Sequence, residues 1–152
     1  MLNVLSLTAT GTIAASATAS IVNSITLLSN NVFTLLNNIT KKIHQTEIIN
    51  LLNKTDIEAT MKLLHAIIIE IPESNTNSIL ISLNNVKDII KQIEEELISI
   101  HKKIEYNESL YILQSIRSYD CSLDLENITT KIMILDRRSD YLFRILRLNK
   151  NI

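Results

Sequence analysis

The chain has 152 residues, of which 46% are hydrophobic, and its formal net charge is −1 at pH 7. This length suits one domain with a sizeable core, and the balanced charge excludes a strongly basic nucleic-acid-binding protein. Glycine and proline occur once each, at Gly11 and Pro72. So few turn-forming residues exclude a β-sandwich, which needs frequent turns. We therefore expect a single all-α domain over residues 1–152.

The first segment, residues 6–43, has no charged residue before Lys41. It lacks the basic start and the concentrated apolar run of a secretory signal peptide. Each window of about 20 residues, the length of a membrane span, also contains several Ser, Thr or Asn residues. We expect neither a signal peptide nor a constitutive span. The single Cys121 cannot form an internal disulfide, which favours a reducing, cytoplasmic setting.

Apolar and small residues of this first segment recur at alternating intervals of four and three, which is heptad spacing and predicts a long helix with one packed face. The positions are Leu7, Gly11, Ala14, Thr18, Ile21, Ile25, Leu28, Val32, Leu35 and Ile39. The opposite face would carry uncharged polar residues such as Ser20 and Asn23. The stretch "LLSNN" at residues 27–31 is compatible with a break that divides the helix in two.

Three further segments, residues 55–71, 77–105 and 122–148, repeat the heptad spacing. Their seams are Ile57, Met61, Leu64, Ile68 and Ile71; Ile79, Leu83, Val86, Ile90, Ile93, Leu97, Ile100 and Ile104; and Leu125, Ile128, Ile132, Leu135, Ser139, Leu142 and Leu146. Thr55 and Glu58 have the spacing of a capping box, and Pro72 requires the second helix to end before it. Four such segments predict an up-down four-helix bundle. The apolar connection at 106–120 predicts a short extra helix or brace between helices three and four.

Residues that carry chemistry form no recognisable site. His44, His65 and His101 lie in different segments without metal-ligand spacing, and His101 with Glu105 is more typical of a helix-surface contact. The sequence has no phosphate-binding glycine loop and no nucleophile elbow, and Cys121 has no visible base. We expect a protein that is not an enzyme and binds no metal or cofactor.

Basic residues are the remaining candidates for a binding site. They lie at the end of the first segment and along the last, at Lys41, Lys42, Lys131, Arg137, Arg138, Arg144 and Arg147. One interpretation is salt bridging, for instance between Asp140 and Arg144, with cations favoured near a helix C-terminus. The other is a patch for anionic membranes, where each basic residue near the surface contributes about 1 kcal/mol.

The chain also resembles a family in the order of its segments. The uncharged start, "MLNVLSLTATGTIAASATASIVNSI", and the end, "SLNNVKDIIKQIEEELISIHKKIEYNESLYILQSIRSYDCSLDLENITTKIMILDRRSDYLFRIL", are similar to the HeLo-type domain of fungal cell-death proteins. They are also similar to the four-helix bundle of mixed-lineage kinase domain-like proteins. The connecting stretch further resembles small helical proteins of large DNA viruses.

This resemblance implies a bundle that binds anionic phospholipid, oligomerises and permeabilises membranes, or engages host cell-death proteins. It adds Arg117, in the connection "SIRSYD", to the candidate binding residues. The family's bundle is joined to a regulatory domain, and none follows Leu148 here. We therefore expect a constitutively competent inducer or a decoy, cytoplasmic or peripheral to membranes. The alternative function is a structural or assembly protein, for instance in a virus particle, whose heptad seams drive homo-oligomerisation.

Overall fold

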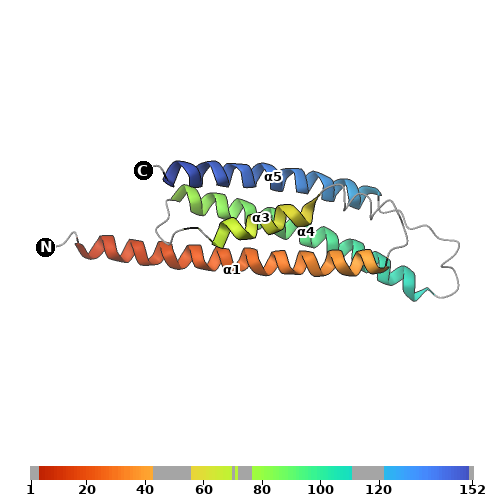
Figure 1. The fold of residues 1–152 in the computed structure, drawn as a ribbon. Coiled ribbons are helices and arrows are strands. Elements are labelled where there is room, and N and C mark those ends of the chain that lie inside the picture. The colour runs from red at the N-terminus through yellow and green to blue at the C-terminus, as the bar shows by residue number, and fades with distance from the viewer. Residues whose placement is uncertain (1–3, 43–55, 70, 72–76, 111–121, 151–152) are drawn as a thin grey trace.

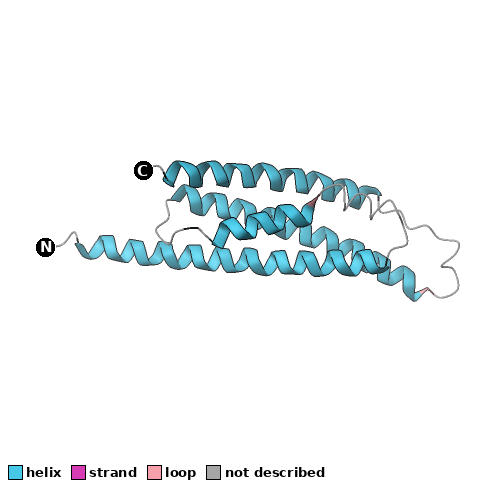
Figure 2. Ribbon diagram, in the orientation of Figure 1, coloured by secondary structure: helices cyan, strands magenta, loops and turns pink. Residues whose placement is uncertain are grey.

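The computed structural model describes residues 4–42, 56–69, 71, 77–110 and 122–150. They form four helices and no strand: α1 (Val4–Lys42), α3 (Ile57–Ile69), α4 (Asn77–Ser109) and α5 (Ser122–Lys150) (Figures 1 and 2). The prediction of an all-α protein is confirmed, and the helix bounds lie within a few residues of those expected from the heptad spacing.

The four helices enclose one hydrophobic core. Helix α4 packs along most of its length against α1 on one side and α5 on the other, while the short α3 contacts both α1 and α5 (Figure 1). Each helix contributes its apolar stripe to this core. Fully burying one Leu or Ile side chain contributes about 1.5–3 kcal/mol, so the shared stripe is the main source of stability.

The predicted seams of α3, α4 and α5 match the buried positions closely. All eight seam residues of α4 are buried, and so are four of the five predicted for the α3 segment, the fifth, Ile71, being half-buried. In α5 the central seam residues are buried, whereas Leu125 and Leu146 at its two ends are half-buried. Enclosure is therefore most complete along α4, which has long neighbours on two sides.

Helix α1 follows its predicted seam at Thr18, Ile25, Val32 and Ile39, which are buried. The predicted positions between them, Ile21, Leu28 and Leu35, are half-buried, whereas Ser29 and Leu36 are buried. The buried positions from Ile25 to Ile39 still alternate by four and three, but the intermediate ones lie one residue later than predicted. The apolar side of a packed helix is wide enough to contain both sets of positions, so spacing alone did not separate them.

The predicted break at residues 27–31 is wrong, because α1 is continuous from Val4 to Lys42. Its hydroxyl groups are accommodated without interrupting the helix. Thr26 Oγ1 donates a hydrogen bond to the carbonyl oxygen of Val22 at 3.0 Å, and Thr34 Oγ1 donates to that of Asn30 at 2.9 Å. These bonds return to the preceding turn, so a Thr- and Ser-rich sequence stays helical.

The helix ends correct the sequence analysis in two places. Asp56, with φ 47°, stands immediately before α3, and its carbonyl oxygen accepts the first helical bond from the N–H of Thr60 at 3.1 Å. Asp56 therefore occupies the N-cap position that the capping-box pattern assigned to Thr55, and Asp is among the residues that tolerate a positive φ. The second correction concerns the end of α4, which was predicted at residue 105 and lies at Ser109. The rest of the predicted brace, residues 111–120, lies outside the described residues.

Candidate functional site

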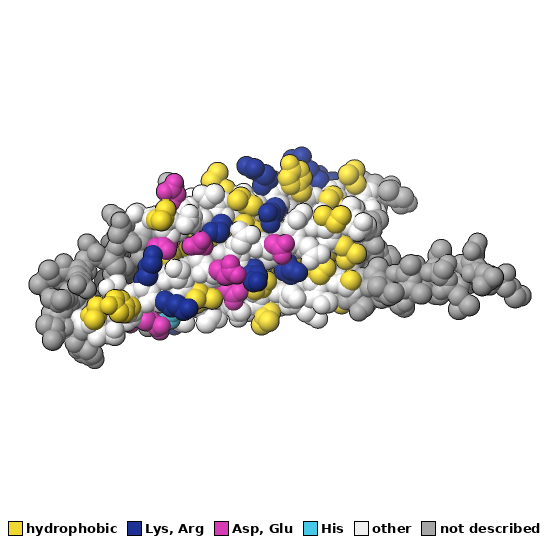
Figure 3. All heavy atoms as spheres, turned by 180° about the vertical axis from the view of Figure 1, so that it is seen from behind, with side chains coloured by type: hydrophobic (Ala, Val, Ile, Leu, Met, Phe, Trp, Pro, Cys, Tyr) yellow, Lys and Arg dark blue, Asp and Glu magenta, His cyan; other side chains and the backbone are white. Residues whose placement is uncertain are grey.

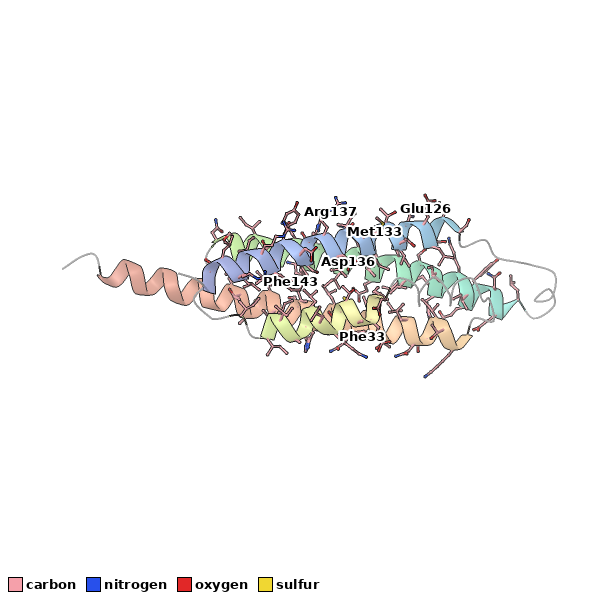
Figure 4. The ribbon with its side chains drawn as sticks, turned by 45° about the horizontal axis from the view of Figure 1, so that its top comes forward. Phe33, Glu126, Met133, Asp136, Arg137 and Phe143 are labelled. Carbon is pink, nitrogen blue, oxygen red and sulfur yellow. The ribbon has the colours of Figure 1, made fainter. Side chains whose placement is uncertain are left out.

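Three of the predicted basic residues are exposed on the outer side of α5. Arg137, Arg144 and Arg147 point away from the core, and Figure 4 shows Arg137 on the outward edge of the helix. Within the described part of the chain, none of the three forms an ion pair, and the alternative Asp140–Arg144 bridge is absent. Their guanidinium groups are available to an anion from outside the bundle.

Two other half-buried basic residues of α5 make contacts to α4. Lys131 Nζ lies 2.5 Å from Glu96 Oε1 of α4, with side chains only 20% and 22% exposed. Arg138 Nη1 donates a hydrogen bond to the backbone oxygen of Asn85, also on α4. Lys131 and Arg138 thus tie α5 to α4, which is the salt-bridging interpretation for Lys131.

The basic end of α1 does not join the arginines of α5. Lys41 is exposed near the last turn of α1, and this turn lies at the end of the bundle where α5 begins (Figure 1). The second half of α5, with its three free arginines, lies at the opposite end. The Lys42 side chain and the whole of Arg117 fall outside the described residues. The predicted candidates are therefore not one patch.

Exposed apolar side chains accompany the arginines of α5. Met133, Tyr141 and Leu148 are 62%, 58% and 67% exposed. Figure 3 shows apolar and basic side chains next to one another along the upper edge of the molecule. Sequence reasoning missed these apolar residues because it followed the buried seam. The signal was nevertheless present, since Met133, Arg137 and Tyr141 recur every four residues on the face opposite that seam.

The outward face of α1 carries no charge before Lys41, as predicted. Among residues 17–40, whose side chains the structure describes, its exposed positions are Ala19, Ser20, Asn23, Leu27, Asn30, Thr34, Asn37 and Asn38. By length and composition, Ala17–Lys41 is the one stretch within the described residues that is able to cross a membrane, and 17% of its most apolar window is buried. A core helix of a soluble protein meets the same two criteria, and so does a signal sequence, which like this stretch lies near the N-terminus.

The start of α1 and the arginine-rich half of α5 lie at the same end of the molecule. The first turns of α1 extend past the ends of α4 and α5 (Figures 1 and 4), and α5 ends at this same end of the bundle. The direction in which the two helices run thus places an uncharged helix end and an unpaired cluster of cations at one end of the molecule.

The remaining polar contacts are structural. Lys103 Nζ lies 2.6 Å from the buried Asp124 Oδ2 and joins α4 to the first turn of α5. His101 Nδ1 is 3.6 Å from Glu105 Oε2 on the same helix, which is the predicted surface contact. Among the described residues, no three His, Cys, Asp or Glu side chains are grouped so as to hold a metal ion. Comparisons with protein-family models, curated proteins and solved structures give no match.

Proposed function

We propose that the chain is a non-enzymatic, up-down four-helix bundle that binds anionic membranes from the cytoplasmic side. The observation that carries this proposal is that the free arginines of α5 and the uncharged, projecting start of α1 lie at the same end. The helix directions support the topology, since α1 and α4 run from left to right in Figure 1 and α3 and α5 run back.

The outer face of α5 supplies the electrostatic attraction. Within the described residues Arg137, Arg144 and Arg147 form no ion pair, although the exposed Asp140 lies among them, and each arginine adds about 1 kcal/mol beside an anionic surface. Tyr141 lies between Arg137 and Arg144, and Leu148 follows Arg147; both are exposed and offer apolar surface to the headgroup boundary. This mixture of arginine and apolar residues on one helix face is typical of helices that lie in a membrane interface.

Helix α1 supplies the segment whose transfer from water into the bilayer costs the least free energy. A charged residue carried to a bilayer centre costs about 2.5–3.5 kcal/mol on the insertion scale. The outward face of α1 has none over residues 19–38. Once the arginines hold the bundle at a surface, the start of α1 is the nearest segment that can enter the apolar layer.

The resemblance to HeLo-type and mixed-lineage kinase domain-like bundles extends this proposal to cell death. In that setting the chain acts as an inducer that perturbs membranes, or as a decoy that occupies a host cell-death protein. Leakage separates the two roles, because an inducer releases the contents of anionic vesicles whereas a decoy binds its host partner without releasing them.

The test is binding of the purified chain to vesicles with and without anionic lipid, at low and high salt. Replacing Arg137, Arg144 and Arg147 together by glutamine is expected to weaken binding to anionic vesicles by about 3 kcal/mol, roughly a hundredfold. High salt is expected to weaken wild-type binding, because exposed charges are screened over about 10 Å at 0.1 M.

A matched control removes three positive charges elsewhere, through Lys62→Gln, Lys91→Gln and Lys102→Gln on α3 and α4. These lysines are also exposed, and the control is expected to retain most of the binding. Equal losses in the two triple variants would mean that net charge alone acts. A wild-type protein that does not bind anionic vesicles at low salt would contradict the proposed function.

A further inference from the structure

The outer side of α5 has its own regular stripe of exposed residues. It extends over about 38 Å at a rise of 1.5 Å per residue, and every position in it is exposed. The stripe consists of Leu123, Glu126, Thr130, Met133, Arg137, Tyr141, Arg144 and Leu148. Four of these are large apolar side chains that are more than half exposed. A stripe with this spacing is the kind of surface against which a second helix packs.

Charge is distributed unevenly along this stripe. Its first half carries Glu126, and its second half carries Arg137 and Arg144, with the exposed Arg147 and Asp140 beside them. Figure 4 shows Glu126, Met133 and Arg137 in line along the outward edge of α5. A partner helix that complements the stripe must therefore present cations near Glu126 and an anion near Arg144, with apolar residues between and beyond them.

We propose that this partner is the same stripe of a second copy, packed antiparallel about a two-fold axis. An axis that passes beside residues 135–136 places Leu148 opposite Leu123 of the other copy and Arg144 level with Glu126. Tyr141 then lies against Thr130. Two-fold symmetry repeats each of these contacts, so this register forms the Leu148–Leu123 contact twice and the Arg144–Glu126 pair twice.

The antiparallel direction follows from the same charges. A parallel pair would place Glu126 beside Glu126 and Arg144 beside Arg144, which is repulsive. The antiparallel pair joins opposite charges and also sets the two helix dipoles in opposite directions. It removes four apolar side chains per copy from water, with exposed fractions between 58% and 68%. A single helix stripe is narrow, so the dimer is expected to be concentration-dependent.

Arg137 is the one residue that opposes this pairing. It lies next to the two-fold axis, so the two Arg137 guanidinium groups approach each other in the dimer. Replacing Arg137 by methionine is therefore expected to strengthen the dimer, because it removes the repulsion and adds apolar surface near Met133. In a different register, in which Arg137 meets an acidic residue, the same substitution would weaken the dimer. The direction of the change in dimer affinity therefore distinguishes the two registers.

The experiment is sedimentation of the full chain, without lipid, over a wide range of protein concentration. Glu126→Arg and Arg144→Glu are each expected to weaken the dimer at least about tenfold, since each places like charges together. The double variant, Glu126→Arg with Arg144→Glu, is expected to recover the wild-type dimer. Glu95→Arg on the exposed side of α4 is the matched control and is expected to leave the dimer unchanged.

A wild-type chain that stays monomeric at the highest concentration would overturn the dimer. A double variant as weak as the single variants would overturn the antiparallel register. This inference does not rest on the proposed membrane function, because the readout contains no lipid. The two proposals use the same face of α5, so the dimer would compete with vesicle binding. They are still tested separately, because sedimentation is measured without lipid and vesicle binding is measured at protein concentrations at which the chain is monomeric.

Discussion

Helices α1 and α4 pack side by side and bury the same kind of seam, yet their exposed sides are opposites. The outer side of α4 carries Lys91 and Glu95 at 3.8 Å, together with other charged residues. The outer side of α1 carries Ser, Thr, Asn and Leu, without charge up to Lys41. Both helices bury one apolar side, which is what the bundle requires of them. The exposed face of α4 is suited to remain in water, whereas that of α1 can also enter a less polar environment.

The largest effect is expected from the seam that both helices share. Leu97, on α4, is fully buried, so Leu97→Ala is expected to lower the free energy of unfolding by about 2–5 kcal/mol. Ile132→Ala on α5 is expected to cost a similar amount. Glu95→Ala on the exposed side of α4 is expected to change it by less than about 0.5 kcal/mol. Denaturant unfolding gives all three values.

Three equal, small changes would mean that α4 is not the centre of the core. A large effect of Glu95→Ala with small effects of the two truncations would reverse the assignment of inner and outer sides. Either result would remove the comparison between α1 and α4, because that comparison assumes one shared seam.

The seams show how far sequence alone leads. Every seam position of α4 was predictable, because neighbours on two sides enclose its apolar stripe over the whole length. In α1 the same spacing selected Leu28 and Leu35, whereas Ser29 and Leu36 are the buried residues, because either pair alternates by four and three with Ile25, Val32 and Ile39. A hydroxyl at Ser29 gives no sequence signal of burial, so this position was not predictable from residue type.

The candidate site was predictable in composition but not in arrangement. Sequence identified the basic residues of α5, but Lys131 and Arg138 are held by Glu96 and Asn85, which come from another helix. Such partners depend on tertiary packing and on the register between helices. The exposed Met133 and Tyr141 were missed because apolar residues on a helix predict burial in general, and their exposure depends on which neighbours are present.

The second prediction tests the uncharged face of α1 against the charged face of α4. Asn23→Lys on α1 and Gln92→Lys on α4 both add one positive charge at an exposed position. Both variants are expected to retain wild-type thermal stability, because a solvated charge on a helix surface costs little. In binding to anionic vesicles, Asn23→Lys is expected to cost a few kcal/mol where the face of α1 leaves water.

Gln92→Lys is expected to leave vesicle binding unchanged or slightly stronger, since its charge stays in water. If Asn23→Lys also strengthens binding, the face of α1 does not enter the apolar layer, and α5 alone accounts for membrane contact. Measuring both variants at two salt concentrations separates the electrostatic contribution, which salt screens, from the insertion cost, which it does not.

The smallest effect concerns a polar residue inside α1. Ser29 is 2% exposed, and within the described residues its Oγ has no hydrogen-bond partner. Ser24, on the same helix, donates a hydrogen bond from Oγ to the carbonyl oxygen of Ser20 at 2.9 Å. A buried hydroxyl without a partner destabilises a protein, and alanine is the better helix former. Ser29→Ala is therefore expected to raise the free energy of unfolding by about 1 kcal/mol.

Ser24→Ala is the matched control for this change. It gains the same helix propensity but loses a hydrogen bond, so it is expected to be close to neutral. The difference between the two variants in denaturant unfolding isolates the cost of the buried hydroxyl. Equal effects would show that the Ser29 hydroxyl is satisfied in solution, for instance by a bound water. A stabilised Ser29→Ala together with a neutral Ser24→Ala would show that the buried Ser29 hydroxyl destabilises α1 locally. The predicted seam of α4, which is apolar throughout, has no such residue.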